Sequence, residues 1–180
     1  MRRVIVSNLM TVDGYFEGPN HAFDWFVPDL EFMEYAKSML RSADTLLFGR
    51  RTYEHMANYW PTAPADEIAE KMNNLRKIVF SRTLRELEWK NAKLAKENLA
   101  EEISKLKGMP GNDMVVLGSA SIASALLEQG LVDEYRVILD PILLGGGTLL
   151  FSGITKRTKL RLCSAKPFGS GVVLLTYQKA

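Results

Sequence analysis

Two stretches of this sequence decide its fold: Asp44-Thr45-Leu46-Leu47-Phe48-Gly49 and Asp113-Met114-Val115-Val116-Leu117-Gly118. Each runs from an acid through one further residue and three apolar residues to a glycine. Each is followed at once by a segment of helical period, 50–58 in the first case and 119–129 in the second. A short apolar run that ends at glycine and leads into a helix is typical of a buried strand in an α/β fold.

The rest of the chain alternates in the same way. Helices are predicted from about Asp29 to Ala43 and over 99–106, and strands at 3–8, 77–80, 133–140, 159–165 and 172–178. The last two strands are joined through Pro, Gly and Ser, which is typical of an antiparallel hairpin. We therefore predict one domain over residues 1–180 with an α/β fold, a mixed sheet and a C-terminal antiparallel hairpin.

Composition excludes several classes of function. The chain has 180 residues, a formal charge of +2 and a single cysteine, Cys163, so no intrachain disulfide can form and a reducing compartment is expected. Its Lys and Arg residues form no stripe, which gives nucleic-acid binding no support. Its longest charge-free stretches, 114–127 and 141–155, fall short of the ~18 apolar residues that a membrane span needs. With no signal-peptide pattern at the start, we expect a cytoplasmic protein that binds neither nucleic acid nor membrane.

The common catalytic motifs are missing. The sequence contains no G-x-x-x-x-G-K-[ST] phosphate loop, no G-x-G-x-x-G fingerprint and no G-x-S-x-G nucleophile elbow. Only His21, His55 and Cys163 could supply imidazole or thiolate ligands. No metal site is therefore predicted.

The strand–glycine–helix junctions are candidate anion sites. A helix start presents unpaired N–H groups and a partial positive charge, and glycine lets a phosphate approach the backbone. Arg50, Arg51 and Thr52 add donors at the first junction, and Ser119 adds a hydroxyl at the second. Two such junctions together favour the binding of a dinucleotide. Each one alone is also explained by a tight turn, with Ser119 as an ordinary N-cap.

Two loop segments add to this interpretation. Ser81-Arg82-Thr83 ends a predicted strand with a hydroxyl and an arginine and no acid, which suits the 2′-phosphate of NADP, although a solvated loop would read the same. Asp13-Gly14 follows the first strand, where a carboxylate could orient a substrate or relay a proton; Asp-Gly is also a common turn. Trp25, Phe26, Tyr53, Tyr59 and Trp60 could line an aromatic pocket or simply be core.

Several of these motifs together resemble a known family. Gly49-Arg50-Arg51-Thr52-Tyr53-Glu54, Phe80-Ser81-Arg82-Thr83-Leu84, Gly118-Ser119-Ala120, Leu131-Val132-Asp133-Glu134-Tyr135 and Pro141-Ile142-Leu143-Leu144-Gly145-Gly146-Gly147 stand in the order found in dihydrofolate-reductase-like proteins. The branch it is most similar to is the C-terminal reductase domain of the riboflavin-biosynthesis deaminase/reductase. The resemblance implies a mixed, mostly parallel central sheet flanked by helices, with NADPH across the carboxyl ends of the central strands.

The resemblance also implies roles for particular residues. The predicted cofactor-binding residues are Gly49, Arg50, Arg51, Thr52, Ser81, Arg82, Gly118, Ser119 and Ala120. Asp13 is the predicted catalytic residue, and Asn8, Gly14 and Asp29 are predicted to contact the substrate. Asp29 resembles the substrate-binding acid of folate reductases only superficially, so we interpret it first as a helix cap.

The resemblance predicts an NADPH-dependent reductase that acts on a small heterocyclic substrate. Where riboflavin reductases carry an Asp-Asp-Pro segment, this chain reads Tyr53-Glu54-His55-Met56, which leaves the ribosylaminopyrimidine substrate open. A pterin reductase and a non-catalytic NADP-binding module are the alternatives. The branch is commonly dimeric, and the apolar 137–144 segment with the terminal hairpin suggests exposed strand surface, so a homodimer is expected.

Overall fold

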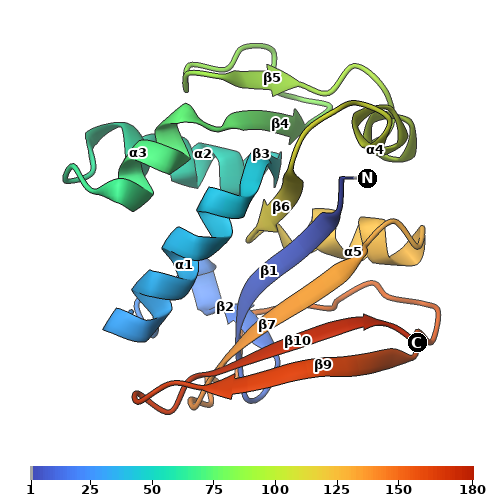
Figure 1. Cartoon of the computed structure of the whole chain (residues 1–180). Coiled ribbons are helices and arrows are strands. Elements are labelled where there is room, and N and C mark those ends of the chain that lie inside the picture. Colours follow the sequence, from blue (N-terminus) through green and yellow to red (C-terminus); the bar gives the residue numbers. More distant parts are fainter. Residues whose placement is uncertain (1) are drawn as a thin grey trace.

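The structure, a computed structural model, describes residues 2–180 and is built on one large sheet. Eight strands follow the order β5-β4-β3-β6-β1-β7-β10-β9, and the first six of these run parallel (Figure 1). Their bounds are β1 (Val4–Thr11), β3 (Ala43–Gly49), β4 (Arg76–Phe80), β5 (Ala92–Leu94), β6 (Asp113–Leu117), β7 (Glu134–Asp140), β9 (Leu160–Pro167) and β10 (Val173–Lys179). A second sheet pairs β2 (Tyr15–Glu17) with β8 (Thr148–Leu149) in antiparallel fashion.

Helices cover both faces of the parallel part of the sheet. They are α1 (Leu30–Ser42), α2 (Arg50–Tyr59), α3 (Glu67–Asn74), α4 (Leu99–Lys107) and α5 (Ala120–Glu128), with short 3₁₀ turns η1 (Pro19–His21) and η2 (Trp60–Thr62). In β1, Val4 and Val6 pack with α4 and α5, while Ile5 packs with α1 and α3. Successive side chains of a strand point to opposite faces, so an uninterrupted apolar run produces two cores. No helix of residues 2–180 is long and apolar enough to span a membrane.

The predicted fold class is confirmed: the sheet is mixed and mostly parallel, helices flank it, and β9 and β10 form a C-terminal antiparallel pair. The predicted helices and strands all occur, with ends shifted by up to three residues. The sequence did not predict α3, β5, β2 or β8. Three of these elements have two or three residues. Helix α3 has eight residues, fewer than the ~12–15 that a helix needs to be stable by itself.

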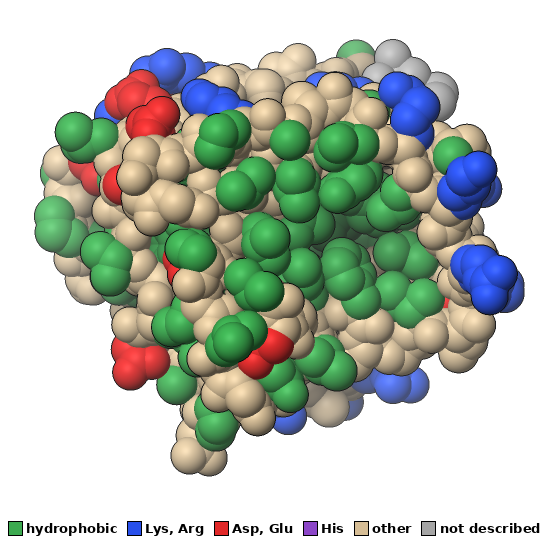
Figure 2. Space-filling view, turned by 90° about the horizontal axis from the view of Figure 1, so that it is seen from below, with side chains coloured by type: hydrophobic (Ala, Val, Ile, Leu, Met, Phe, Trp, Pro, Cys, Tyr) green, Lys and Arg blue, Asp and Glu red, His purple; other side chains and the backbone are tan. Residues whose placement is uncertain are grey.

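The three outer strands share an apolar face, whose inner residues Tyr135 and Tyr177 pack into the core with α4 and α5. Register partners form the rows Val137–Leu175–Ala165, Leu139–Val173–Pro167 and Tyr135–Tyr177–Leu162 across β7, β10 and β9. Leu162 keeps 51% of its surface exposed. β9 and β10 lie lowest in Figure 1, and Figure 2, which views the molecule from below, shows hydrophobic side chains around a hollow with Lys and Arg along its right side.

Candidate functional site

The carboxyl ends of β3, β4 and β6 open onto one cleft of about 1560 Å³. This is the edge at which ligands bind in open α/β sheets. All of the predicted cofactor-binding residues line this cleft, namely Gly49, Arg50, Arg51, Thr52, Ser81, Arg82, Gly118, Ser119 and Ala120. The tertiary structure therefore brings together three segments that lie about thirty or more residues apart in the sequence.

The two strand–glycine–helix junctions are bonded to each other. The backbone N–H of Gly49 donates to Ser119 Oγ over 2.8 Å, in a buried contact. Gly118 and Ser119 both have left-handed backbones, with φ of 64° and 60°. A non-glycine residue in this region costs free energy and persists where the surrounding structure holds it. Ser119 occupies the N-cap position of α5 but makes no side-chain cap, so its interpretation as an ordinary N-cap is wrong.

Positive charge faces the cleft from α2. Arg50 and Arg51 lie in the first turn of this helix, where unpaired N–H groups and the helix dipole already favour an anion. The guanidinium of Arg50 lies 3.9 Å from Glu54, and that of Arg51 lies 3.4 Å from His21 Nε2. Both contacts are exposed, and exposed contacts of this kind contribute little free energy. Either guanidinium could therefore turn toward a bound phosphate at small cost.

The turn after β4 is ordered by Ser81. Its Oγ accepts the backbone N–H groups of Thr83, at 3.2 Å, and Leu84, at 3.0 Å. The Ser81 hydroxyl keeps its own proton, which can turn from Thr83 Oγ1, 3.4 Å away, to a ligand. Arg82 lies beside it with an exposed side chain, and no ion pair occupies its guanidinium within residues 2–180. This pair offers a hydroxyl donor and a full positive charge at the rim of the cleft.

Asp13 holds two loops together. Its carboxylate accepts the Thr11 hydroxyl at 2.6 Å and the backbone N–H groups of Leu144 and Gly145 at 3.2 and 2.7 Å. These hydrogen bonds, that from Thr11 first, lower the pKa of Asp13 below its ordinary value. Asp13 is therefore ionised at neutral pH, which suits an orienting carboxylate better than a proton donor. It is not among the described residues that line the cleft.

The three predicted substrate contacts also lie outside that lining. Asn8 is buried under the second junction, where its Nδ2 donates to the carbonyl of Gly118 over 3.2 Å and its Oδ1 has no partner in the described part of the chain. Gly14 closes the turn after β1 with φ of 91°. Asp29 is the N-cap of α1 and accepts the N–H of Phe32 over 2.7 Å, which confirms its interpretation as a helix cap. Substrate contact by these residues stays a prediction.

Another part of the lining of the same cleft is mostly apolar, and we call this part the aromatic chamber. It is lined by residues of β1, β7, α1 and the segment before α1, namely Ser7, Leu9, Phe16, Phe23, Phe26, Pro28, Phe32, Met33, Tyr35, Ala36, Met39, Leu40 and Ile138. Of the five aromatic residues predicted from the sequence, Phe26, Tyr59 and Trp60 line the cleft, Trp25 is half-buried outside its lining, and Tyr53 is core. The cluster of aromatic residues within 23–32 is the sequence signal that could have located the chamber.

The family of the chain follows from comparison with known proteins. A model of the RibD C-terminal domain matches residues 2–174, so the chain belongs to that family of reductase-like domains. It is 35% identical to the uncharacterized protein YyaP of Bacillus subtilis (strain 168), over 98% of this chain and 94% of YyaP. A second uncharacterized protein of that organism, YwjB, is 25% identical over 96% of each chain.

Solved structures agree on the fold. A putative riboflavin biosynthesis protein from Shewanella sp. PV-4 superimposes with a TM-score of 0.81 and 21% identity over 99% of both chains. The diaminohydroxyphosphoribosylaminopyrimidine deaminase/5-amino-6-(5-phosphoribosylamino)uracil reductase of Thermotoga maritima gives a TM-score of 0.73 at 16% identity, and this chain spans 57% of its length. RibD of Acinetobacter baumannii is similar, with a TM-score of 0.73.

Proposed function

We propose that the protein is an NADPH-dependent reductase that transfers a hydride to a small heterocyclic substrate, as the reductases of riboflavin biosynthesis do. One observation carries this proposal: every residue predicted to hold the cofactor lines the same cleft, which also has an apolar part. Membership of the RibD C-terminal domain family supports it independently.

Each part of the cleft has a role in this proposal. The first turns of α2 and α5, with Arg50 and Arg51, hold the diphosphate by N–H groups and charge. Ser81 and Arg82 meet the 2′-phosphate. NADPH supplies the hydride when bound, and the chain's task is to hold the acceptor carbon within about 3–3.5 Å of the donor and to exclude water. Asp13 remains the predicted catalytic residue, as a carboxylate that orients the site through the 144–145 loop.

Calorimetric titration with NADPH and NADH tests the cofactor. NADPH should bind at least tenfold tighter, because a charge-assisted hydrogen bond contributes on the order of 1.5–3 kcal/mol. Arg82→Glu should abolish or reverse this preference. Arg85→Glu is a matched control, because Arg85 is an exposed arginine near Arg82 that does not line the cleft. Equal affinity for both cofactors, unchanged by Arg82→Glu, would refute the assignment.

Turnover separates the reductase from a binding module. We expect oxidation of NADPH with at least one compound from a panel of pyrimidinediones and pteridines. A protein that binds NADPH tightly and oxidises none of the panel would favour the non-catalytic module. A preference for dihydropterins within the panel would favour the pterin-reductase alternative.

A further inference from the structure

His21 lies at the exposed rim of the cleft, between an acid and a cation. Its Nδ1 lies 2.6 Å from Glu17 Oε1, and its Nε2 lies 3.4 Å from Nη1 of Arg51. All three residues line the cleft. Glu17 belongs to β2 and Arg51 to the first turn of α2, so the His21 imidazole connects two separate elements of the site.

The carboxylate of Glu17 is fixed by the neighbouring strand. Thr148 in β8 donates its hydroxyl to Glu17 Oε1 over 2.6 Å, and β2 and β8 pair along their backbones. A Cβ at Gly147 would collide with the carbonyl oxygen of Glu17, so glycine at this position is what allows the two segments to approach. The acid that faces His21 therefore has a defined place.

The two contacts of the His21 ring call for different forms of the imidazole. Guanidinium has donors only, so the ring nitrogen that faces Arg51 presents its lone pair. The proton of the neutral ring then lies on Nδ1, where it is donated to the Glu17 carboxylate. A protonated ring would oppose a second N–H and a second positive charge to the guanidinium. The charge of Arg51 thus opposes protonation of His21, whereas the charge of Glu17 favours it.

Few other charges act on this ring. Glu17 and Arg51 are the charged groups of residues 2–180 that lie within hydrogen-bond or ion-pair distance of it. From α2, Arg50 and Glu54 also line the cleft, but they face each other at 3.9 Å. If the guanidinium of Arg51 turned away, the His21 ring would be left with a carboxylate as its one close charged neighbour.

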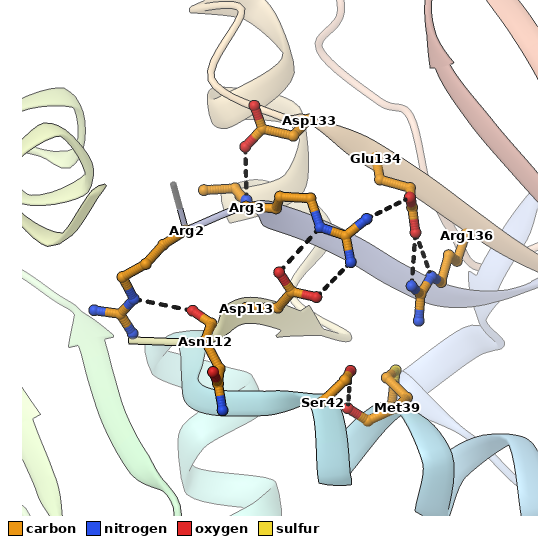
Figure 3. Close-up of polar contacts among 10 residues, drawn as sticks. Arg2, Arg3, Met39, Ser42, Asn112, Asp113, Asp133, Glu134 and Arg136 are labelled. Carbon is orange, nitrogen blue, oxygen red and sulfur yellow. Dashed lines mark hydrogen bonds and ion pairs between the residues drawn. The ribbon is translucent and has the colours of Figure 1, made fainter. Parts of the chain in front are cut away.

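The charged residues at the other end of the sheet are arranged differently. At the amino ends of β1, β6 and β7, Arg3 donates to Asp113 at 2.6 Å and to Glu134 at 3.1 Å (Figure 3). Arg136 donates to the same Glu134 at 2.7 Å. Both arginines are thus bonded to carboxylates, and none of the four residues lines the cleft. Arg51 differs from them, because the group beside it that can accept from it most closely is a neutral imidazole.

A phosphate bound at Arg51 would change the surroundings of His21. The contact between the two side chains is long and exposed, so Arg51 can exchange it for a phosphate oxygen at small cost. With the guanidinium turned away, the Nε2 lone pair of His21 can take a proton from solvent, which it reaches because 54% of its side chain is exposed. The imidazolium then has Glu17 on one side and the phosphate on the other, and a charge-assisted hydrogen bond to each.

We propose that His21 is a further anion-binding residue of the cleft, which becomes protonated when a diphosphate binds at Arg51 and then donates from Nε2 to a phosphate oxygen. The inference rests on the proposed function in one respect, that this diphosphate belongs to the cofactor. Binding of the diphosphate therefore takes up a proton. By linkage, affinity falls as the pH rises through the range in which imidazole loses its charge, roughly pH 5 to 8.

Calorimetric titration of the full chain with NADPH counts these protons when it is repeated in two buffers of different ionisation enthalpy. At about pH 7, the wild type should take up about 0.3 proton or more per cofactor in excess of His21→Gln. The difference excludes protons that the phosphate groups themselves exchange, because both proteins bind the same phosphates. Glu17→Gln should also reduce the uptake. His55→Gln is the matched control, because His55 is the other histidine that lines the cleft, and it should keep the wild-type uptake.

A second measurement does not need the cofactor. The chain has two histidines, so the ring C–H resonances of His21 and His55 can be followed separately in an NMR titration with pH. Arg51→Gln should move the midpoint of the His21 titration to higher pH by about 0.3 or more, the size expected for an exposed charge nearby. Inorganic sulfate, compared with chloride at equal ionic strength, should do the same to the wild type. The His55 midpoint should stay where it is.

Two results would overturn the proposal: equal proton uptake by the wild type and His21→Gln, and a His21 midpoint that neither Arg51→Gln nor sulfate moves. Thermal unfolding shows whether each variant folds, and if Arg51→Gln does not, the sulfate titration of the wild type decides. A protein in which sulfate acts on His21 but to which NADPH does not bind would refute the proposed function and leave this inference standing. NADPH binding without any uptake that depends on His21 would refute this inference alone.

Discussion

Gly49→Ala should disturb the bond between the two junctions. The backbone of Gly49, with φ of −83°, accepts any residue, so the cost comes from packing alone. An added Cβ would lie 2.6 Å from Ser119 Oγ and 3.2 Å from Ile122 Cγ1. Overpacking costs roughly 1–3 kcal/mol, and the lost N–H bond adds about 1 kcal/mol. A stiffer unfolded chain offsets about 0.4–1 kcal/mol. We expect a net loss of about 2 kcal/mol in the free energy of unfolding.

A double-mutant cycle shows whether Ser119 Oγ is the cause. Ser119→Ala leaves the buried Gly49 N–H unpaired and should cost about 1–3 kcal/mol. In the double variant the added methyl no longer meets the oxygen, so the combined loss should fall short of the sum by about 1 kcal/mol or more. Urea unfolding measures each value. Gly18→Ala is the control, because its methyl would meet only Ala22, at 3.5 Å. Losses that add within about 0.5 kcal/mol would refute the reasoning.

Three further predictions concern other parts of the molecule. Asp13→Asn should keep NADPH binding and lower turnover by roughly 10²-fold, because it weakens the carboxylate that holds the 144–145 loop in place, and unchanged turnover would contradict its predicted role. Burial first, then Lys90, lowers the pKa of Lys77 from 10.5 to about 8, so the folded state binds fewer protons than the unfolded state between these values. Stability should therefore rise with pH from about 8 to 10.5, and urea unfolding of Lys77→Met should show a smaller rise. Light scattering should give twice the chain mass of 20.3 kDa, and Leu162→Glu, on the apolar outer strands, should reduce it to one chain; a wild-type monomer would reject the homodimer.

Local sequence was enough to place the predicted cofactor-binding residues at one edge of the sheet. Gly49 and Gly118 each end an apolar run and precede a helix. This local pattern predicts that the residues beside them lie at the end of a strand. The carboxyl ends of neighbouring parallel strands meet at one edge of the sheet, which is why these residues converge. The pattern could not indicate that Ser119 would bond Gly49 instead of capping α5, because that contact joins residues 70 positions apart.

The predicted substrate-binding part of the site depends on contacts that only the folded chain makes. Asp13 bonds to the backbone at 144–145, which is more than 130 positions away in the sequence. The residues around Asp13 therefore give no indication that it holds this loop. Asp29 was predicted as a cap because a cap is a local hydrogen bond.

The sequence by itself therefore determined the α/β class, the parallel core and the sheet edge at which the candidate cofactor-binding residues gather, since apolar runs, glycines and helix starts act over a few residues. The tertiary structure alone decided which side chains line the aromatic chamber. Ser7 of β1 and Tyr35 of α1 are brought within hydrogen-bond distance by the packing of α1 on the sheet, and packing between elements is a property that no single segment contains.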